Sequence, residues 1–324
     1  MTGRQWQWVG AVVAVMAFAA VVAVLIPSGP VPVEIRLAGP ERIRSAPLYV
    51  AMDKGFLAEQ RITLVVTPFY TGKEAYVETM AGRQDVAAVA GMPVVTAWAN
   101  GQKPAVLATL SQANAQAAIV VRGVGRGDIR RLRGQKVAVL KATTSELFLI
   151  TMLGSVGLTP QDVEIVDVPE KSIIDALAGG QVAAASLWEP VLGQALARFG
   201  REVSVIDNDG SFVDYWLLAT SETWLNANRG AAERLLRALV KAQEFIRAHP
   251  DEARAIVQRH VPRDSMVWDP RIFRIRLDTA LLESLKGNAR IALGVADPSS
   301  LVEALHPAPL RAVAPAMVGL DIRP

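Results

Sequence analysis

A stretch that occurs twice places the strongest constraint on the fold of this chain. Residues 182–190, VAAASLWEP, echo residues 85–93, DVAAVAGMP, and in both copies a helix-like segment precedes the stretch and an Ala-rich helical run follows it. Each copy holds a short strand of small residues without polar alternation, which is typical of a strand covered on both faces. Two copies of one αβαβ pattern predict an α/β protein with two similar lobes, each a mainly parallel sheet flanked by helices.

The turns that follow these two strands are the predicted walls of a cleft. Open α/β sheets bind ligands where strands end and helices begin, so two facing lobes would enclose a ligand between such turns. The small apolar residues within the strands are interpreted as core. Trp188, which lies between Leu187 and Glu189 at a predicted strand end, either packs as core or lines the pocket.

Composition excludes several classes of function. The 324 residues are 51% hydrophobic, which is enough core material for two domains. The formal net charge is only +3 and the basic residues are scattered, so no nucleic-acid partner is predicted. Cysteine is absent, which rules out disulfides, thiolate nucleophiles, cysteine metal sites and a lipid-modified N-terminal cysteine.

The N-terminal region contains an apolar run long enough to approach the span of a bilayer. From Val9 to Ile26 no polar or charged side chain occurs. Arg4 and the pair Trp6 and Trp8 precede this run, which predicts an uncleaved anchor with its N-terminus in the cytoplasm and the rest exported. The alternative is a removed signal peptide, although no small-x-small exit precedes Pro27.

The rest of the chain is predicted to cross between the lobes twice. The Gly-spaced stretch Gly123–Gly127 is the expected first crossing, and Phe212–Leu218 is the expected second. The expected organisation is a signal anchor and tether at 1–31, lobe one at 32–122 and 214–324, and lobe two at 123–213. Beyond the second crossing, the pattern predicts an amphipathic helix at Arg271–Leu285 and a surface tail over the Pro-rich residues 307–324.

Hydroxyl side chains at predicted helix starts are candidate ligand contacts. Thr143, Thr144 and Ser145 open a helix after a predicted strand, where O–H groups and unpaired backbone N–H groups can cradle an oxyanion. A plain N-cap without a ligand explains the same residues equally well. Thr71 stands before another predicted helix and carries the same two interpretations.

Five segments in a fixed order give the chain a family resemblance. They are Pro47–Phe56 (PLYVAMDKGF), Leu132–Val139 (LRGQKVAV), Ala178–Gln181 (AGGQ), Trp188–Pro190 (WEP) and Glu244–Ala253 (EFIRAHPDEA). Together they resemble the periplasmic substrate-binding proteins of nitrate/sulfonate/taurine-type ABC importers, from Val33 to about residue 290. The resemblance implies a two-lobed, type II-like periplasmic-binding-protein fold with a two-stranded hinge. It also implies a monomer without a cofactor that captures a small molecule and delivers it to an ABC permease in the inner membrane.

The pocket loops of that family correspond to seven segments of this chain. The ligand-binding residues that the resemblance implies are Arg42, Ser45, Tyr70, Thr71, Gly72, Gln112, Asn114, Thr143, Thr144, Ser145, Trp188, Glu189, Asp214 and Tyr215. The corresponding turn Ala88–Gly91 lacks the hydroxyl or charged residues of many sulfonate binders. An apolar half-pocket disfavours a small inorganic anion such as nitrate and favours an organic ligand that is anionic or strongly polar, either sulfonate-like or nitrogenous.

Two other functions remain open from the sequence. An anchored binding protein could act as a sensor that signals through a membrane partner, because closure of two lobes serves sensing as well as import. A cleft enzyme of the pyrimidine-synthase-like branch would need a cysteine-rich segment, which this chain lacks. No catalytic or metal site is predicted, since His249, His260 and His306 lie away from the cleft and no nucleophile elbow or metal spacing occurs.

Overall fold

The computed structural model describes residues 31–39, 41–114, 117–123, 127–207, 210, 212–261 and 268–320. The chain divides into two compact units, Met1–Val33 and Glu34–Pro324, and the second carries the fold. The predicted anchor, Val9–Ile26, lies outside the described residues. Within the described ranges, no helix is both long and apolar enough to cross a bilayer.

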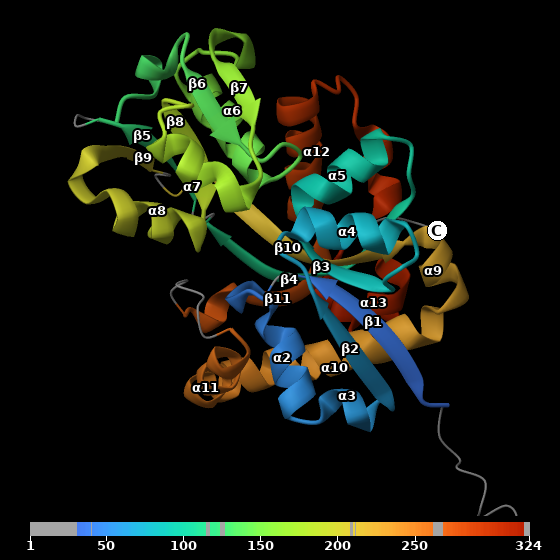
Figure 1. The fold of residues 1–324 in the computed structure, drawn as a ribbon. Helices are drawn as coiled ribbons and strands as arrows, with labels where there is room; N and C mark the ends of the chain where they lie inside the picture. The colour runs from blue at the N-terminus through green and yellow to red at the C-terminus, as the bar shows by residue number, and fades with distance from the viewer. Residues whose placement is uncertain are drawn as a thin grey trace, which may run out of the picture. The chain divides into compact units, whose positions relative to one another are not determined.

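The first of two sheets has seven strands in the order β12-β11-β4-β10-β3-β1-β2 (Figure 1). Its strands are β1 (Val33–Gly39), β2 (Ile62–Pro68), β3 (Val86–Ala90), β4 (Pro104–Asn114), β10 (Val213–Ser221), β11 (Phe273–Asp278) and β12 (Val318–Gly319). The helices between them are α2 (Ala46–Asp53), α3 (Phe56–Glu59), α4 (Gly72–Met80), α5 (Gly91–Ala99), α9 (Glu222–Ala227), α10 (Arg229–Ala248), α11 (Pro250–His260), α12 (Thr279–Leu293) and α13 (Pro307–Val313).

The second sheet has five strands in the order β7-β6-β8-β5-β9. Its strands are β5 (Ala117–Arg122), β6 (Lys136–Val139), β7 (Glu164–Asp167), β8 (Ala184–Trp188) and β9 (Val203–Asp207), and its helices are α6 (Thr144–Ser155), α7 (Glu170–Ala178) and α8 (Val191–Phe199). Strand β8 is covered on both faces, because Ala184 packs into one hydrophobic cluster and Ala185 and Leu187 into the other. Burial on both faces explains the non-alternating sequence of this strand.

Short 3₁₀ helices complete the described secondary structure. They are η1 (Ile43–Ser45), η2 (Ile129–Leu132), η3 (Pro160–Asp162), η4 (Gly200–Glu202), η5 (Pro270–Ile272), η6 (Ser299–Ala304) and η7 (Pro315–Met317).

The repeated stretches occupy equivalent positions in the two sheets. The order β2-β1-β3-β10-β4 in the larger sheet has the same pattern as β7-β6-β8-β5-β9 in the smaller one, with β3 and β8 in the middle. The expectation of mainly parallel sheets is wrong, because both sheets are mixed. Strand β10 runs antiparallel to β3 and β4, and β5 runs antiparallel to β8 and β9. The direction of these two strands is set by passage from the other lobe and not by a βαβ crossover, which would make them parallel.

The first crossing lies earlier in the chain than the sequence predicted. Strand β5 pairs with β8 and β9, so Ala117–Arg122 belongs to the five-stranded sheet and not to lobe one. The polar stretch before it is the end of β4, in which Ser111 and Gln112 pair with Trp216 and Tyr215 of β10. The chain therefore passes between the sheets after Asn114, and it returns between Asp207 and Val213.

The C-terminal part differs from the sequence expectation in two places. Within the predicted helix Arg271–Leu285, residues Phe273–Asp278 form strand β11, in which Phe273, Ile275 and Leu277 are buried and alternate with two arginines. That period of two is the signature of a half-buried strand, and the helix starts only at Thr279. The predicted surface tail forms α13, whose Leu310 is buried, and β12, which joins the sheet parallel to β11.

Candidate ligand-binding site

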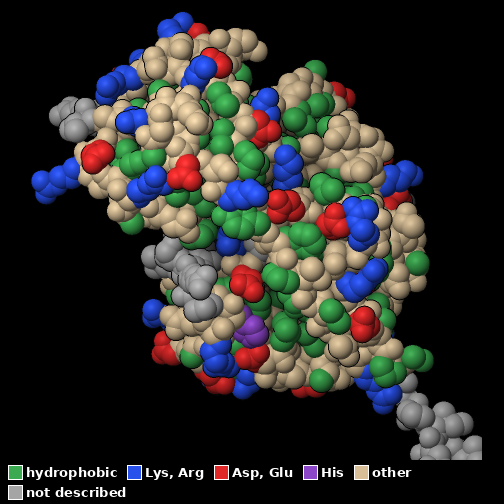
Figure 2. All heavy atoms as spheres, in the orientation of Figure 1, with side chains coloured by type: hydrophobic (Ala, Val, Ile, Leu, Met, Phe, Trp, Pro, Cys, Tyr) green, Lys and Arg blue, Asp and Glu red, His purple; other side chains and the backbone are tan. Residues whose placement is uncertain are grey.

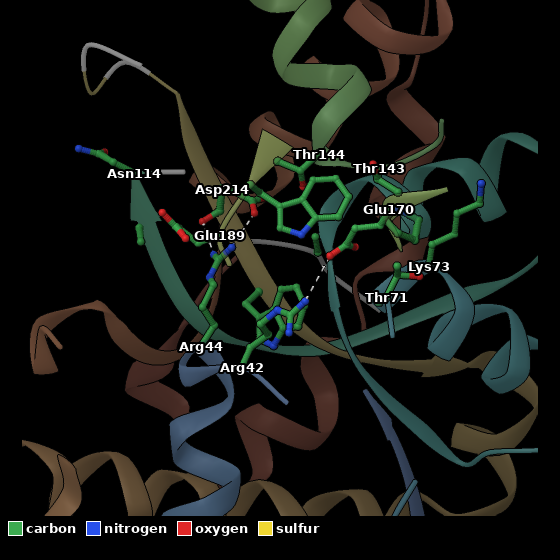
Figure 3. Close-up of a pocket in the computed structure, with 16 residues that line it drawn as sticks. Arg42, Arg44, Thr71, Lys73, Asn114, Thr143, Thr144, Glu170, Glu189 and Asp214 are labelled. Atoms are coloured by element: carbon green, nitrogen blue, oxygen red, sulfur yellow. Dashed lines mark hydrogen bonds and ion pairs between the residues drawn. The ribbon is translucent and has the colours of Figure 1, made fainter. Parts of the chain in front are cut away.

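A cavity of about 100 Å³ lies where helices of both sheets begin (Figure 3). Its lining residues are Arg42, Arg44, Thr71, Gly72, Lys73, Ala90, Pro93, Ala113, Asn114, Thr143, Thr144, Glu170, Trp188, Glu189, Asp214 and Trp216. One water molecule needs about 10–15 Å³ of such space, so the cavity has room for a molecule of several heavy atoms. Thr143 and Thr144 lie on one side of it, and Arg42 and Arg44 lie on the opposite side (Figure 3).

Arg44 and Asp214 form an ion pair that lines the cavity on the side of the seven-stranded sheet. The Arg44 guanidinium donates to the Asp214 carboxylate at 2.6 Å and to the Asp214 backbone oxygen at 2.8 Å. It also lies 5.4 Å from the ring centroid of Trp216, whose indole N–H donates to the Ser45 hydroxyl at 2.9 Å. The charge of Arg44 is thus balanced within its own lobe, and the indole ring is held in place by a cation–π contact and a hydrogen bond.

Arg42 and Glu170 meet across the cavity from different lobes (Figure 3). One guanidinium nitrogen of Arg42 lies 3.7 Å from Glu170 Oε1, and the Glu170 side chain is only 4% exposed. The other carboxylate oxygen, Oε2, is buried and has no hydrogen-bond partner among the described residues. Burial raises the pKa of Glu170 to about 7, nearby Arg42 opposes that rise, and Glu74 adds to it.

A second polar contact joins the two lobes beside the cavity. The Lys73 ammonium, in the first turn of α4, donates to the backbone oxygen of Lys141 at 2.8 Å. Lys141 precedes the turn that leads into α6. Helices α5 and α12 also contact α6, so the structure shows the lobes in contact at several points.

The hydroxyl groups around the cavity differ in their freedom to bind a ligand. Thr143 caps α6 by accepting from Ser145 N–H at 3.3 Å, and it donates its own proton to Leu140 O at 2.6 Å. Thr71 caps α4 by accepting from Glu74 N–H at 3.1 Å, in a reciprocal capping box. Among the described residues, no acceptor takes the hydroxyl proton of Thr71 or Thr144. These two hydroxyls can therefore donate to a ligand.

The structure brings most of the predicted contact residues to one cavity. Those that line it are Arg42, Thr71, Gly72, Asn114, Thr143, Thr144, Trp188, Glu189 and Asp214. Glu189 also accepts a hydrogen bond from Gly193 N–H at 3.3 Å, which stabilises the start of α8. The other predicted residues, Ser45, Tyr70, Gln112, Ser145 and Tyr215, are not part of the lining.

Local geometry explains why those five residues lie outside the lining. Ser145 is fully buried and donates to Ser186 O at 2.7 Å, while Ser45 accepts from the Trp216 indole. Tyr215 follows Asp214 in β10 and points to the opposite face, because successive side chains of a strand alternate. Gln112 lies on the neighbouring strand β4, where it pairs with Tyr215 of β10. Tyr70 is 53% exposed.

Four polar or aromatic lining residues are not among the predicted contact residues, namely Arg44, which lies in the predicted pocket loop Arg42–Ser45, and Lys73, Glu170 and Trp216. Trp216 lies two residues after Asp214 in a strand, so side-chain alternation places both on one face. The sequence could therefore have predicted Trp216 from Asp214. Arg44 and Lys73 adjoin predicted contact residues. Glu170, the first residue of α7, has no predicted contact residue beside it in the sequence.

A family model described as NMT1/THI5 like matches residues 42–253, which is more than half of the chain. The chain belongs to the NMT1/THI5-like family. This membership confirms the resemblance drawn from the five segments. The matched range runs from η1 to the first turn of α11, so it includes all five strands of the smaller sheet, part of the larger sheet and every residue that lines the cavity.

Relatives of this NMT1/THI5-like chain carry names of binding proteins. A protein of Brucella abortus (strain 2308), provisionally named a binding protein, is 24% identical over 149 residues, which is 45% of this chain and 46% of that protein. A protein of Bacillus subtilis (strain 168), provisionally named an aliphatic sulfonates-binding protein, is 26% identical over 214 residues, 64% of each chain. The chain thus spans from about half to just under two thirds of the length of these relatives.

Solved structures show the same fold. The alkanesulfonate-binding protein from Xanthomonas axonopodis pv. citri, bound to MOPS, superimposes with a TM-score of 0.67 at 16% sequence identity, covering 86% of this chain and 99% of that one. The two-lobed α/β fold of periplasmic binding proteins is therefore shared. No group of three metal-ligating side chains occurs within the ranges that the structure describes.

Proposed function

We propose that this protein is an extracytoplasmic solute-binding protein, and not an enzyme, that captures a small organic ligand between its lobes and delivers it to an ABC permease. The observation that carries the proposal is the cavity itself. It is walled by two tryptophans and by helix starts from both sheets. The pair Arg42–Glu170 reaches across it, and the pair Lys73–Lys141 joins the lobes beside it. A ligand in this position contacts both lobes at once, so it stabilises the closed form by its higher affinity for that form.

The lining favours an organic ligand with an acidic or strongly polar group. Ala90, Pro93, Trp188 and Trp216 provide apolar surface for a carbon skeleton or a planar group. The start of α6 and the Thr71 and Thr144 hydroxyls provide donors for an acidic group. The sulfonate names of the relatives support a ligand of this kind. Nitrate would leave the apolar surface without a partner.

Binding of such a ligand is measured by thermal denaturation of the full chain with alkanesulfonates, aminosulfonates, other nitrogen-bearing acids and nitrate. A ligand at a hundred times its Kd adds about 2.7 kcal/mol of stability, enough to raise Tm by several degrees. A panel that leaves Tm unchanged throughout would count against the proposed function. Import, as opposed to sensing, predicts that the loaded protein stimulates ATP hydrolysis by its reconstituted permease.

We also propose that the protein works on the periplasmic side of the inner membrane and keeps the apolar run Val9–Ile26 as an anchor. The support is the length of the run and the absence of a small-x-small exit after it. The expected result is that the exported protein sediments with membranes and starts at its original N-terminus. N-terminal sequencing that begins near residue 28 would show a cleaved signal instead.

A further inference from the structure

Glu170 carries a buried carboxylate whose hydrogen-bonding capacity is mostly unused. Its side chain is 4% exposed, one oxygen lies 3.7 Å from Arg42, and the other has no partner among the described residues. A separation of 3.7 Å is too long for a hydrogen bond, so Arg42 contributes charge but no donor. A buried acceptor without a donor is costly to the fold, and such groups are rare unless something else completes them.

Among the described residues, no donor lies within hydrogen-bond distance of this second oxygen. The titratable or charged groups that face it are Arg42, Tyr70 and Glu74, and Lys73 lies across the same cavity. Glu74 is occupied by the capping box with Thr71, and Lys73 donates to Lys141 O. Glu170 makes no helix cap, since Pro169 is the N-cap residue of α7 and no side chain caps that helix. The carboxylate therefore serves the cavity and not the fold.

We propose that Glu170 accepts a hydrogen bond from an N–H group of the ligand, so that the physiological ligand is a nitrogen-bearing acid and not a simple alkyl acid or an inorganic anion. This inference rests on the proposed function and assigns the class of ligand for the same cavity. The ammonium or other N–H group lies against Glu170 of the five-stranded lobe. The acidic group lies toward the start of α6 and the Thr71 and Thr144 hydroxyls.

The protonation state of Glu170 supplies a readout that is independent of affinity. Because the pKa of Glu170 is raised to about 7, part of the free protein carries a protonated carboxyl at neutral pH. A ligand ammonium lowers the pKa of the carboxyl beside it, so binding releases a proton. The opposite arrangement, a protonated Glu170 that donates to an anionic ligand group, raises the pKa and takes up a proton.

The experiment is calorimetric titration of the full chain with pairs of ligands in which an ammonium replaces a methyl group. Suitable pairs are taurine and propane-1-sulfonate, β-alanine and butyrate, and 2-aminoethylphosphonate and propylphosphonate. At least one ammonium compound should bind about ten- to a hundred-fold more tightly than its methyl partner, with proton release detected in buffers of different ionisation enthalpy. Glu170→Gln should abolish both the preference and the proton release.

Other outcomes separate this inference from the proposed function. Binding of the methyl compounds as tightly as the ammonium compounds, or proton uptake on binding, overturns the role of Glu170 and leaves solute binding intact. Failure of every compound to bind overturns the proposed ligand class, and the inference falls with it.

A measurement without ligand checks that the carboxylate is not a structural requirement. Glu170→Gln should melt at a higher temperature than the unmodified protein at pH 8, because it removes a buried charge. The matched control is Glu164→Gln on β7, whose exposed side chain pairs with Lys136 at 3.5 Å and whose change should leave Tm unaltered. A lower Tm for Glu170→Gln would show that the pair with Arg42 holds the fold together, which overturns the inference.

Discussion

At the scale of single residues, Glu170 makes the stability of the protein depend on pH. Its pKa of about 7 in the folded state exceeds the ordinary value of 4.5, so the unfolded chain loses this proton at lower pH than the folded one. The contribution of Glu170 to stability is complete below pH 4.5 and is lost as the pH rises toward 7. The shift corresponds to about 3 kcal/mol. Chemical denaturation from pH 4.5 to 8 should show this decline, and Glu170→Gln should lack it.

Thr144 and Trp188 distinguish a ligand site from ordinary structure. Loss of the Thr144 hydroxyl should weaken ligand binding by about ten- to a hundred-fold if it donates to a charged group. Truncation of Trp188 to Ala should weaken it at least as much if the ring is a buried anchor. Calorimetry and thermal melting are compared for Thr144→Ala and Trp188→Ala. Variants that melt earlier and bind with unchanged affinity would show that these residues only cap a helix and fill core.

At the scale of elements, the contact between α5 and α12 depends on a glycine at the start of α5. A Cβ on Gly91 would stand 2.9 Å from Leu285 Cδ2 and 3.3 Å from Asn288 Nδ2, and Leu285 is fully buried. Gly91→Ala should therefore destabilise the protein by about 1–3 kcal/mol through overpacking. Gly154→Ala in α6 is the control, because its Cβ meets nothing within 4 Å and should stabilise the helix by up to about 1 kcal/mol. Equal effects in denaturant titrations would contradict this account.

Elements were predictable wherever one periodicity or one helix start dominated the local sequence. Strands β3 and β8 were recognised from short apolar runs, and α4 from Thr71 before its first turn. Strand β11 was missed because Arg271–Leu285 contains both a period of two and a helical period, and only pairing with β4 selects the strand for Phe273–Asp278. Ser45 was predicted to contact the ligand, yet its hydroxyl accepts a hydrogen bond from the Trp216 indole, a pairing across 171 residues that the sequence does not reveal.

At the scale of the whole molecule, ligand binding should reduce the radius of gyration of the protein. In the described part of the chain, the path crosses between the two sheets after Asn114 and again before Val213. A ligand that contacts both sides of the cavity favours the closed form. Small-angle scattering curves of the free and ligand-saturated protein should differ, with the more compact curve for the loaded state. Lys73→Ala removes the hydrogen bond to Lys141 and should reduce this difference at a fixed ligand concentration. Superimposable curves for the free and loaded protein would refute closure.

The sequence alone determined the features that depend on neighbours in the chain. The repeat around β3 and β8, the helix starts at Thr71 and Thr143, and the family segments are local patterns of small residues, hydroxyls and apolar periodicity. Only the tertiary structure decided that β5 belongs to the five-stranded sheet, that both sheets contain parallel and antiparallel strands, and that Arg42 lies beside Glu170. These depend on residues far apart in the sequence, whose pairing follows from strand order and burial. The unpaired oxygen of Glu170 belongs to this second group, because only packing of the two lobes removes the carboxylate from water.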